Sequence, residues 1–156
     1  MCSSDLTILS CSSNKNINRI TKLQKKAVCI ITLSEYNAHT EPIFKKLNIL
    51  PYDKILYQYN YQLVHSIYHK YAPTVLCELL PRNIDRSNNY NLRNIDDFSV
   101  QRVKYEYLKK FPFSSFPTLW NSADENKYIQ NPLSFKIALK NRSEEHTSEL
   151  QSQFRI

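Results

Sequence analysis

The chain has 156 residues, of which 42% are apolar and 22% charged, and its formal net charge is +7. This composition is typical of one globular domain large enough to bury a core, and the basic surplus favours a polyanionic partner. The chain contains no glycine, which excludes the glycine-rich loops of P-loop and Rossmann proteins and the GxSxG elbow of hydrolases. Its turns must therefore be built from Asn, Pro, Ser and Asp.

Residues 1–13 are expected to be a lead-in without stable structure, and residues 14–141 a helical region. The first predicted helix carries apolar residues at intervals of three and four with lysines between them, and this stripe is expected to pack on a partner element. Its apolar residues are Ile17, Ile20, Leu23, Ala27, Ile30 and Ile31. A short helix to about Asn48 follows, with Thr40 as its N-cap. The longest helix begins at Pro51 and keeps one face apolar as far as Tyr71.

The second half of the chain is less regular. We predict a short helix over Thr74 to Leu80, a loop over residues 82–95, and a strand or bulged hairpin over residues 98–107. Residues 111–120 contain two prolines and are expected to be irregular, whereas Asn131 caps a last helix with Pro132 at its first position. The predicted fold is thus mainly α, a small helical domain with amphipathic helices and a short β-hairpin in the C-terminal third.

Clustered cations are the candidate nucleic-acid contacts, because lysine and arginine bind phosphates. They are Lys22, Lys25, Lys26, Lys45, Lys46, Arg93, Arg102, Lys104, Lys109 and Lys110. In the stretch RVKYEYLKKFPF, aromatic residues alternate with cations and could stack on unpaired bases. The alternative, which the sequence alone favours, is that these aromatics belong to the core and the cations face water.

No catalytic, metal or cofactor site is expected. The cysteines form no CxxC pair, and His65 and His69 lack the Glu of an HExxH motif, so we interpret the two histidines as surface or groove residues. Asp96 and Asp97 are interpreted as a turn before a strand. Unpaired thiols suit an intracellular setting, nuclear or cytoplasmic. No apolar run has membrane length, and no small-molecule ligand is indicated.

Several blocks, in order along the chain, resemble one family. The run LQKKAVCIIT at residues 23–32 and YNAHTEPIFKKLNILP at residues 36–51 are followed by NNYNLRN at 88–94, DFSV at 97–100 and LWNS at 119–122. They resemble the C-terminal region of non-LTR retrotransposon reverse transcriptases of the jockey-like kind. The resemblance implies a part of an RNA-directed DNA polymerase that lies outside its catalytic palm. The palm turn has an aromatic residue two positions before its Asp pair, where this chain has Asn94.

Residues 142–152, RSEEHTSELQS, resemble the translation of a short-read sequencing adapter codon by codon. We therefore expect residues 142–156 to be read-through of a library sequence, and exclude them from the fold. The alternative is a short polar helix capped by Ser143.

The expected function is that of a non-catalytic fragment of such a polymerase, which at most assists the binding of RNA or DNA. The alternatives are a small basic helical nucleic-acid-binding or scaffold protein, and the nonfunctional product of a pseudogene. Neither requires a membrane or a cofactor.

Overall fold

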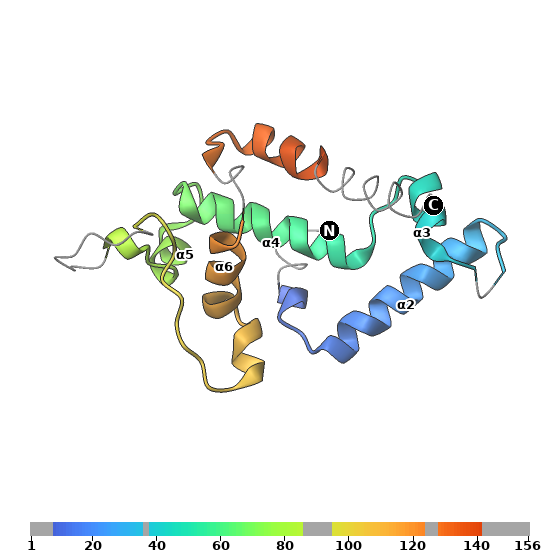
Figure 1. Ribbon diagram of the computed structural model, residues 1–156, viewed down its shortest axis with the longest axis horizontal. Helices are drawn as coiled ribbons and strands as arrows, with labels where there is room; N and C mark the ends of the chain where they lie inside the picture. Colours follow the sequence, from blue (N-terminus) through green and yellow to red (C-terminus); the bar gives the residue numbers. More distant parts are fainter. Residues whose placement is uncertain (1–7, 36–37, 86–94, 124–127, 142–156) are drawn as a thin grey trace, which may run out of the picture. The chain divides into compact units, whose positions relative to one another are not determined.

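A computed structural model describes residues 8–35, 38–85, 95–123 and 128–141. Its main helices are α2 (Asn14–Ile31), α3 (Thr40–Lys46), α4 (Tyr52–Tyr68), α5 (Thr74–Leu79) and α6 (Pro112–Asn121) (Figure 1). Two short 3-10 turns, η1 (Asn83–Asp85) and η2 (Glu106–Lys110), a helical turn over residues 8–10 and a helix over residues 132–141 complete the described structure. The prediction of a mainly helical fold is confirmed. No helix in the described ranges combines the length and the apolar character needed to cross a bilayer.

The chain divides into two compact units, which we call unit 1 (Met1–Tyr59) and unit 2 (Asn60–Ile156). The division falls within α4. Residues 1–7, most of the predicted loop over 82–95, and residues 142–156 lie outside the described residues, so the structure does not test the prediction for the adapter-like tail. Of the predicted lead-in, residues 8–13 are described, and residues 8–10 form a helical turn.

Helices α2, α3 and α4 end in the same way, although the chain has no glycine. In each, the residue after the C-cap has a positive φ: 51° at Leu33, 52° at Asn48 and 60° at Lys70. The next N–H then bonds to the carbonyl five residues earlier, as from Ser34 to Cys29 at 3.0 Å. This is the Schellman motif, in which glycine is usual because a side chain disfavours the left-handed conformation. Leu33 and Lys70 thus occupy turn positions where the composition predicted Asn, Pro, Ser or Asp.

In unit 1, helices α2 and α3 contact each other, but the predicted apolar stripe of α2 is not what packs. Leu23 is 64% exposed, and Ile30 and Ile31 are 73% and 66% exposed. The residues of α2 that are buried are Val28 and Cys29. The prediction that the stripe packs on another element is therefore wrong for these three residues.

Polar side chains one position away from that stripe connect α2 to the start of α4. The Gln24 amide nitrogen donates to the Leu50 carbonyl at 2.9 Å, and its amide oxygen accepts from the Tyr52 N–H at 2.7 Å. The Thr21 hydroxyl lies 3.2 Å from a carboxylate oxygen of Asp53. These hydrogen bonds set the orientation of α2, and apolar periodicity contains no signal for them.

Helix α3 begins one residue earlier than predicted. Thr40 is its first residue, and His39 occupies the N-cap position without a side-chain hydrogen bond. Phe44 is the buried residue of α3, whereas Ile43 and Leu47 are half-buried.

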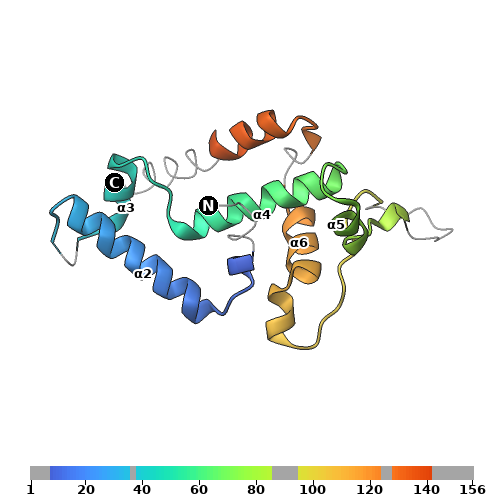
Figure 2. The ribbon, with the colours of Figure 1, turned by 180° about the vertical axis from the view of Figure 1, so that it is seen from behind.

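Unit 2 is built around aromatic rings from α4, α6 and the helix over residues 132–141 (Figure 2). Trp120 of α6 is fully buried, with its ring centroid 5.4 Å from that of Tyr61 and 4.8 Å from that of Tyr68. Phe135 lies 5.2 Å from Tyr61 and stacks on His65 at 3.8 Å. Leu80, Phe98 and Leu139 complete the centre of the core.

The hairpin predicted over residues 98–107 does not form. Its described residues make a single isolated bridge, between Arg82 and Phe98. The Asn121 side chain instead satisfies the backbone of Phe98, accepting from its N–H at 3.0 Å and donating to its carbonyl at 2.8 Å. An amide side chain thus takes the place of a neighbouring strand, and Phe98 is buried against α6.

Residues 111–120 were expected to be irregular, but residues 112–121 form helix α6. Pro112 stands at its first turn, where a missing N–H costs nothing. Pro117 lies inside the helix and loses one backbone hydrogen bond, but it is buried together with Phe116 and Trp120. Burial of these side chains outweighs the local cost of the proline.

The last helix begins as predicted. The Asn131 side-chain oxygen accepts from the N–H of Leu133 at 2.9 Å and from that of Ser134 at 3.4 Å. Both contacts are those of an N-cap, so this prediction is confirmed.

Candidate nucleic-acid interface

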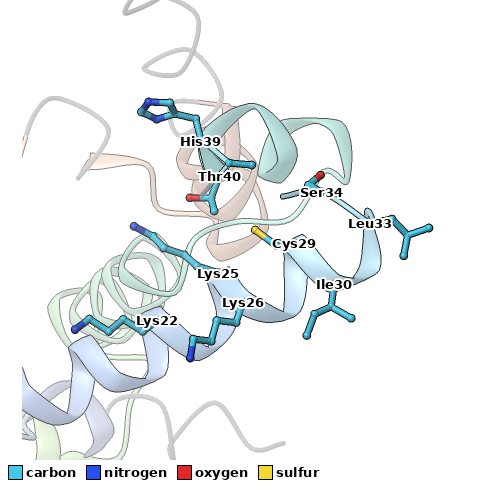
Figure 3. A pocket seen from close by; sticks show the side chains of 10 residues that line it. Lys22, Lys25, Lys26, Cys29, Ile30, Leu33, Ser34, His39 and Thr40 are labelled. Carbon is cyan, nitrogen blue, oxygen red and sulfur yellow. The ribbon is translucent and has the colours of Figure 1, made fainter. Parts of the chain in front are cut away.

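Three of the candidate cations lie together in unit 1. Helix α2 and the chain leading into α3 enclose an open groove of about 1090 Å³. We call it the lysine groove; it is lined by Lys22, Lys25, Lys26, Cys29, Ile30, Leu33, Ser34, Ala38, His39 and Thr40. Figure 3 shows the three lysines on one stretch of α2, with His39 and Thr40 at the start of α3.

Helical spacing explains why the lysines gather. Residues three and four apart on a helix are surface neighbours, so Lys22 lies one turn from both Lys25 and Lys26. All three are exposed, and none of the ten described residues lining the groove carries a negative charge. The lysine groove therefore presents a concentrated positive charge to solvent.

The rest of the groove wall is apolar. Leu33 is 94% exposed and Ile30 73% exposed, whereas Cys29 is buried. The left-handed conformation of Leu33 holds this side chain at the turn that ends α2. A ligand in the groove would thus contact the lysine ammonium groups as well as aliphatic side chains.

Lys45 and Lys46 are exposed at the last turn of α3. Cations are favoured there by the helix dipole, which accounts for them without a ligand. They do not line the lysine groove, so the structure does not gather all the unit 1 candidates at one site.

A second set of cations lies in unit 2, around η2. Arg102 and Lys104 are exposed, Lys110 is half-buried, and the Lys109 ammonium pairs with the Glu106 carboxylate at 2.5 Å. Arg93 lies outside the described residues.

The aromatic residues between these cations are not in the core. Tyr105 and Tyr107 are 60% and 63% exposed, and Phe111 is 42% exposed. The interpretation favoured from the sequence, in which these aromatics are buried, is therefore wrong for these three rings, whereas Phe113 is half-buried and the cations Arg102 and Lys104 do face water. Its physical reason is the missing hairpin, since without a paired strand these side chains have no sheet face to bury.

The two histidines differ in burial: His69 is half-buried, whereas His65 is buried and lines a small open hollow beside Phe135. His65 is 1% exposed, and its Nε2 lies 2.6 Å from the Ile129 carbonyl. A carbonyl only accepts hydrogen bonds, so Nε2 carries the proton. Burial lowers the pKa of His65, the Ile129 carbonyl raises it, and nearby His69 lowers it. His65 is thus a core residue of unit 2.

The acidic pair lies in a turn. Residues 95–97 are bent, and the Asp97 carbonyl accepts from the Asn83 N–H at 2.9 Å. Within the described ranges, His, Cys, Asp and Glu side chains form no group of three that could hold a metal ion.

Comparison of the chain with protein families, curated proteins and solved structures finds no match.

Proposed function

We propose that this chain is a non-catalytic nucleic-acid-binding region, derived from the C-terminal part of a non-LTR retrotransposon reverse transcriptase and acting inside the cell. The observation that carries the binding proposal is the lysine groove, where Lys22, Lys25 and Lys26 share one surface with no carboxylate among the described lining residues. Phosphates are the ligands that such a surface favours.

The resemblance supports the origin. The blocks LQKKAVCIIT and YNAHTEPIFKKLNILP span the second half of α2 and all of α3. Seven of the ten residues that line the lysine groove therefore lie in these blocks, whereas Lys22, Leu33 and Ser34 lie outside them. A role next to the polymerase, positioning template RNA or target DNA, follows from that origin.

The alternatives are a host-adopted small basic binding or scaffold protein and a nonfunctional pseudogene product. The flanking genomic DNA distinguishes them. An open upstream frame with an aromatic residue before an Asp pair favours the polymerase origin, whereas a promoter and stop codon without that frame favour the host protein.

The binding proposal is tested with two matched double variants on the same helix. K25Q/K26Q removes two charges from the groove, whereas K15Q/R19Q removes two charges from exposed positions of α2 outside it. The probe is an unstructured single strand of about 16 nucleotides. The slope of log K against log salt is negative, and each lost phosphate contact reduces its magnitude by about 0.7 for a single strand. K25Q/K26Q should therefore make the slope less steep by about 1.4.

The control variant K15Q/R19Q should leave the slope close to that of the unmodified chain. Equal losses in the two double variants would mean that only net charge matters, and would refute the groove as the site.

A further inference from the structure

Two tyrosines of unit 2 form a stacked pair on the surface. The rings of Tyr105 and Tyr107 are nearly parallel, with an interplanar angle of 22° and centroids 5.7 Å apart. Both are more than half exposed, at 60% and 63%. Tyr105 is the N-cap of η2 and has an extended backbone, whereas Tyr107 lies within η2. The backbone changes from extended chain to 3-10 turn between these two tyrosines, and this change places their rings on the same side of the segment.

Exposed rings of this size require an explanation, because burying them elsewhere would release water from a large apolar surface. The nearby core of unit 2 does not use them, since its buried aromatic rings come from α4, α6, Phe98 and Phe135. The ring pair is therefore available to a flat partner that stacks on it.

The charge around the pair favours an anionic partner. Residues 102–110 contain four cations and a single carboxylate, Glu106, which pairs with Lys109. Arg102 and Lys104 precede the first ring and are exposed. An open hollow of about 600 Å³ lies beside the segment and is lined in part by Val100, Val103 and Lys109.

We propose that residues 102–111 are a binding site for unpaired bases of a single-stranded nucleic acid. Tyr105 and Tyr107 stack on a base, and Arg102 and Lys104 contact its flanking phosphates. A duplex hides its base faces in its own stack, so this site discriminates against it. The inference rests on the proposed nucleic-acid binding and adds the preference for single strands.

The test compares a single strand of about 16 nucleotides with a blunt duplex of the same length, by fluorescence anisotropy with the full chain. Y105A/Y107A should weaken single-strand binding by about 5-fold to 100-fold, the range measured for loss of base stacking. Duplex binding should change less than about 2-fold, because the charges remain. RNA and DNA strands are measured in parallel to identify the preferred sugar.

Two control variants make the result specific. Y105F/Y107F keeps both rings and should retain single-strand binding, whereas Y128A removes a tyrosine of similar exposure, 57%, outside the segment and should have no effect. Emission from Trp120, the single tryptophan, which lies in the unit 2 core, verifies that each variant is folded.

The outcomes separate this inference from the proposed function. Binding of the unmodified chain to both probes, with no loss in Y105A/Y107A, would overturn the stacking site and leave the lysine groove in place. Equal loss for single strand and duplex would also overturn it. Absence of binding to either probe at low salt would refute the proposed function itself.

Discussion

The two units are held together by different kinds of interaction. Unit 2 buries five Tyr, Phe and Trp rings to 3% exposure or less, those of Tyr61, Phe98, Phe116, Trp120 and Phe135. Unit 1 buries fewer large side chains, Phe44 and Tyr52 among them, and leaves Leu23, Ile30 and Ile31 exposed. Its helix α2 is instead fixed by hydrogen bonds from Gln24.

This difference predicts which of the two units is the more stable. An aromatic core contributes several kcal/mol through each large buried side chain, whereas a hydrogen bond contributes about 1 kcal/mol. Unit 2 should therefore be the more stable unit. Unit 1 should open more readily, and its surface presents the lysine groove.

The largest effect is expected from a cavity in unit 2. Phe135→Ala removes a ring that contacts Tyr61 and His65, and should lower the free energy of unfolding by about 3–5 kcal/mol. Urea titration followed by Trp120 emission measures it. The control Leu133→Ala changes a side chain on the same helix that is 66% exposed and should cost less than about 1 kcal/mol. Equal losses would contradict the aromatic core as the source of stability.

A smaller effect is expected in unit 1. Gln24→Ala leaves the Leu50 carbonyl and the Tyr52 N–H without their partner, at a cost of about 1–3 kcal/mol. Amide hydrogen exchange should be faster throughout α2, by about 5-fold or more. Asn18→Ala, at an exposed position of the same helix, is the control. Unchanged protection in Gln24→Ala would show that α2 is held by other contacts.

The smallest effect depends on pH and is confined to unit 2. Burial lowers the pKa of His65 in the folded chain, so the unfolded chain binds more protons below the ordinary value of about 6.5. Stability should therefore fall as pH falls through that value, by at most about 1.4 kcal/mol between about pH 7.5 and about pH 5.5.

His65→Gln supplies a neutral donor for the Ile129 carbonyl and should remove this pH dependence, whereas His39→Gln, at an exposed position of unit 1, should keep it. Urea titrations at the two pH values measure both variants. A pH dependence that persists in His65→Gln would assign it to another group.

Sequence patterns predicted the helices well where one strong local signal was present. The Asn131 cap, the start of α4 near Pro51, and α5 after Pro73 are examples. Each depends on backbone chemistry within a few residues. The zero glycine content predicted turns built from Asn, Pro, Ser and Asp, which is right at Asn48 but wrong at Leu33 and Lys70, where a leucine and a lysine adopt the left-handed conformation.

The predictions were wrong where residues distant in the sequence determine the local structure. The residues over 98–107 alternate like a strand, but Asn121, more than twenty positions later, takes the hydrogen bonds of Phe98. The orientation of α2 follows from Gln24, a polar residue that apolar periodicity ignores. The sequence favours burial of the aromatic residues around η2, whereas the structure exposes Tyr105, Tyr107 and Phe111.

Part of the lysine groove could be predicted from the sequence. Helical spacing placed Lys22, Lys25 and Lys26 on one surface, and they do line one groove. The contribution of Leu33, Ser34 and His39 to that groove depends on how the chain turns between α2 and α3, which no local pattern encodes.

The most direct test of nucleic-acid binding is the affinity of the unmodified chain for a single strand of about 16 nucleotides, titrated between about 50 and 200 mM salt beside a matched duplex. The account predicts that log K falls linearly with log salt for both, and that the single strand binds more tightly at every salt concentration. Binding that is absent at the lowest salt, or that does not weaken as salt rises, would contradict it.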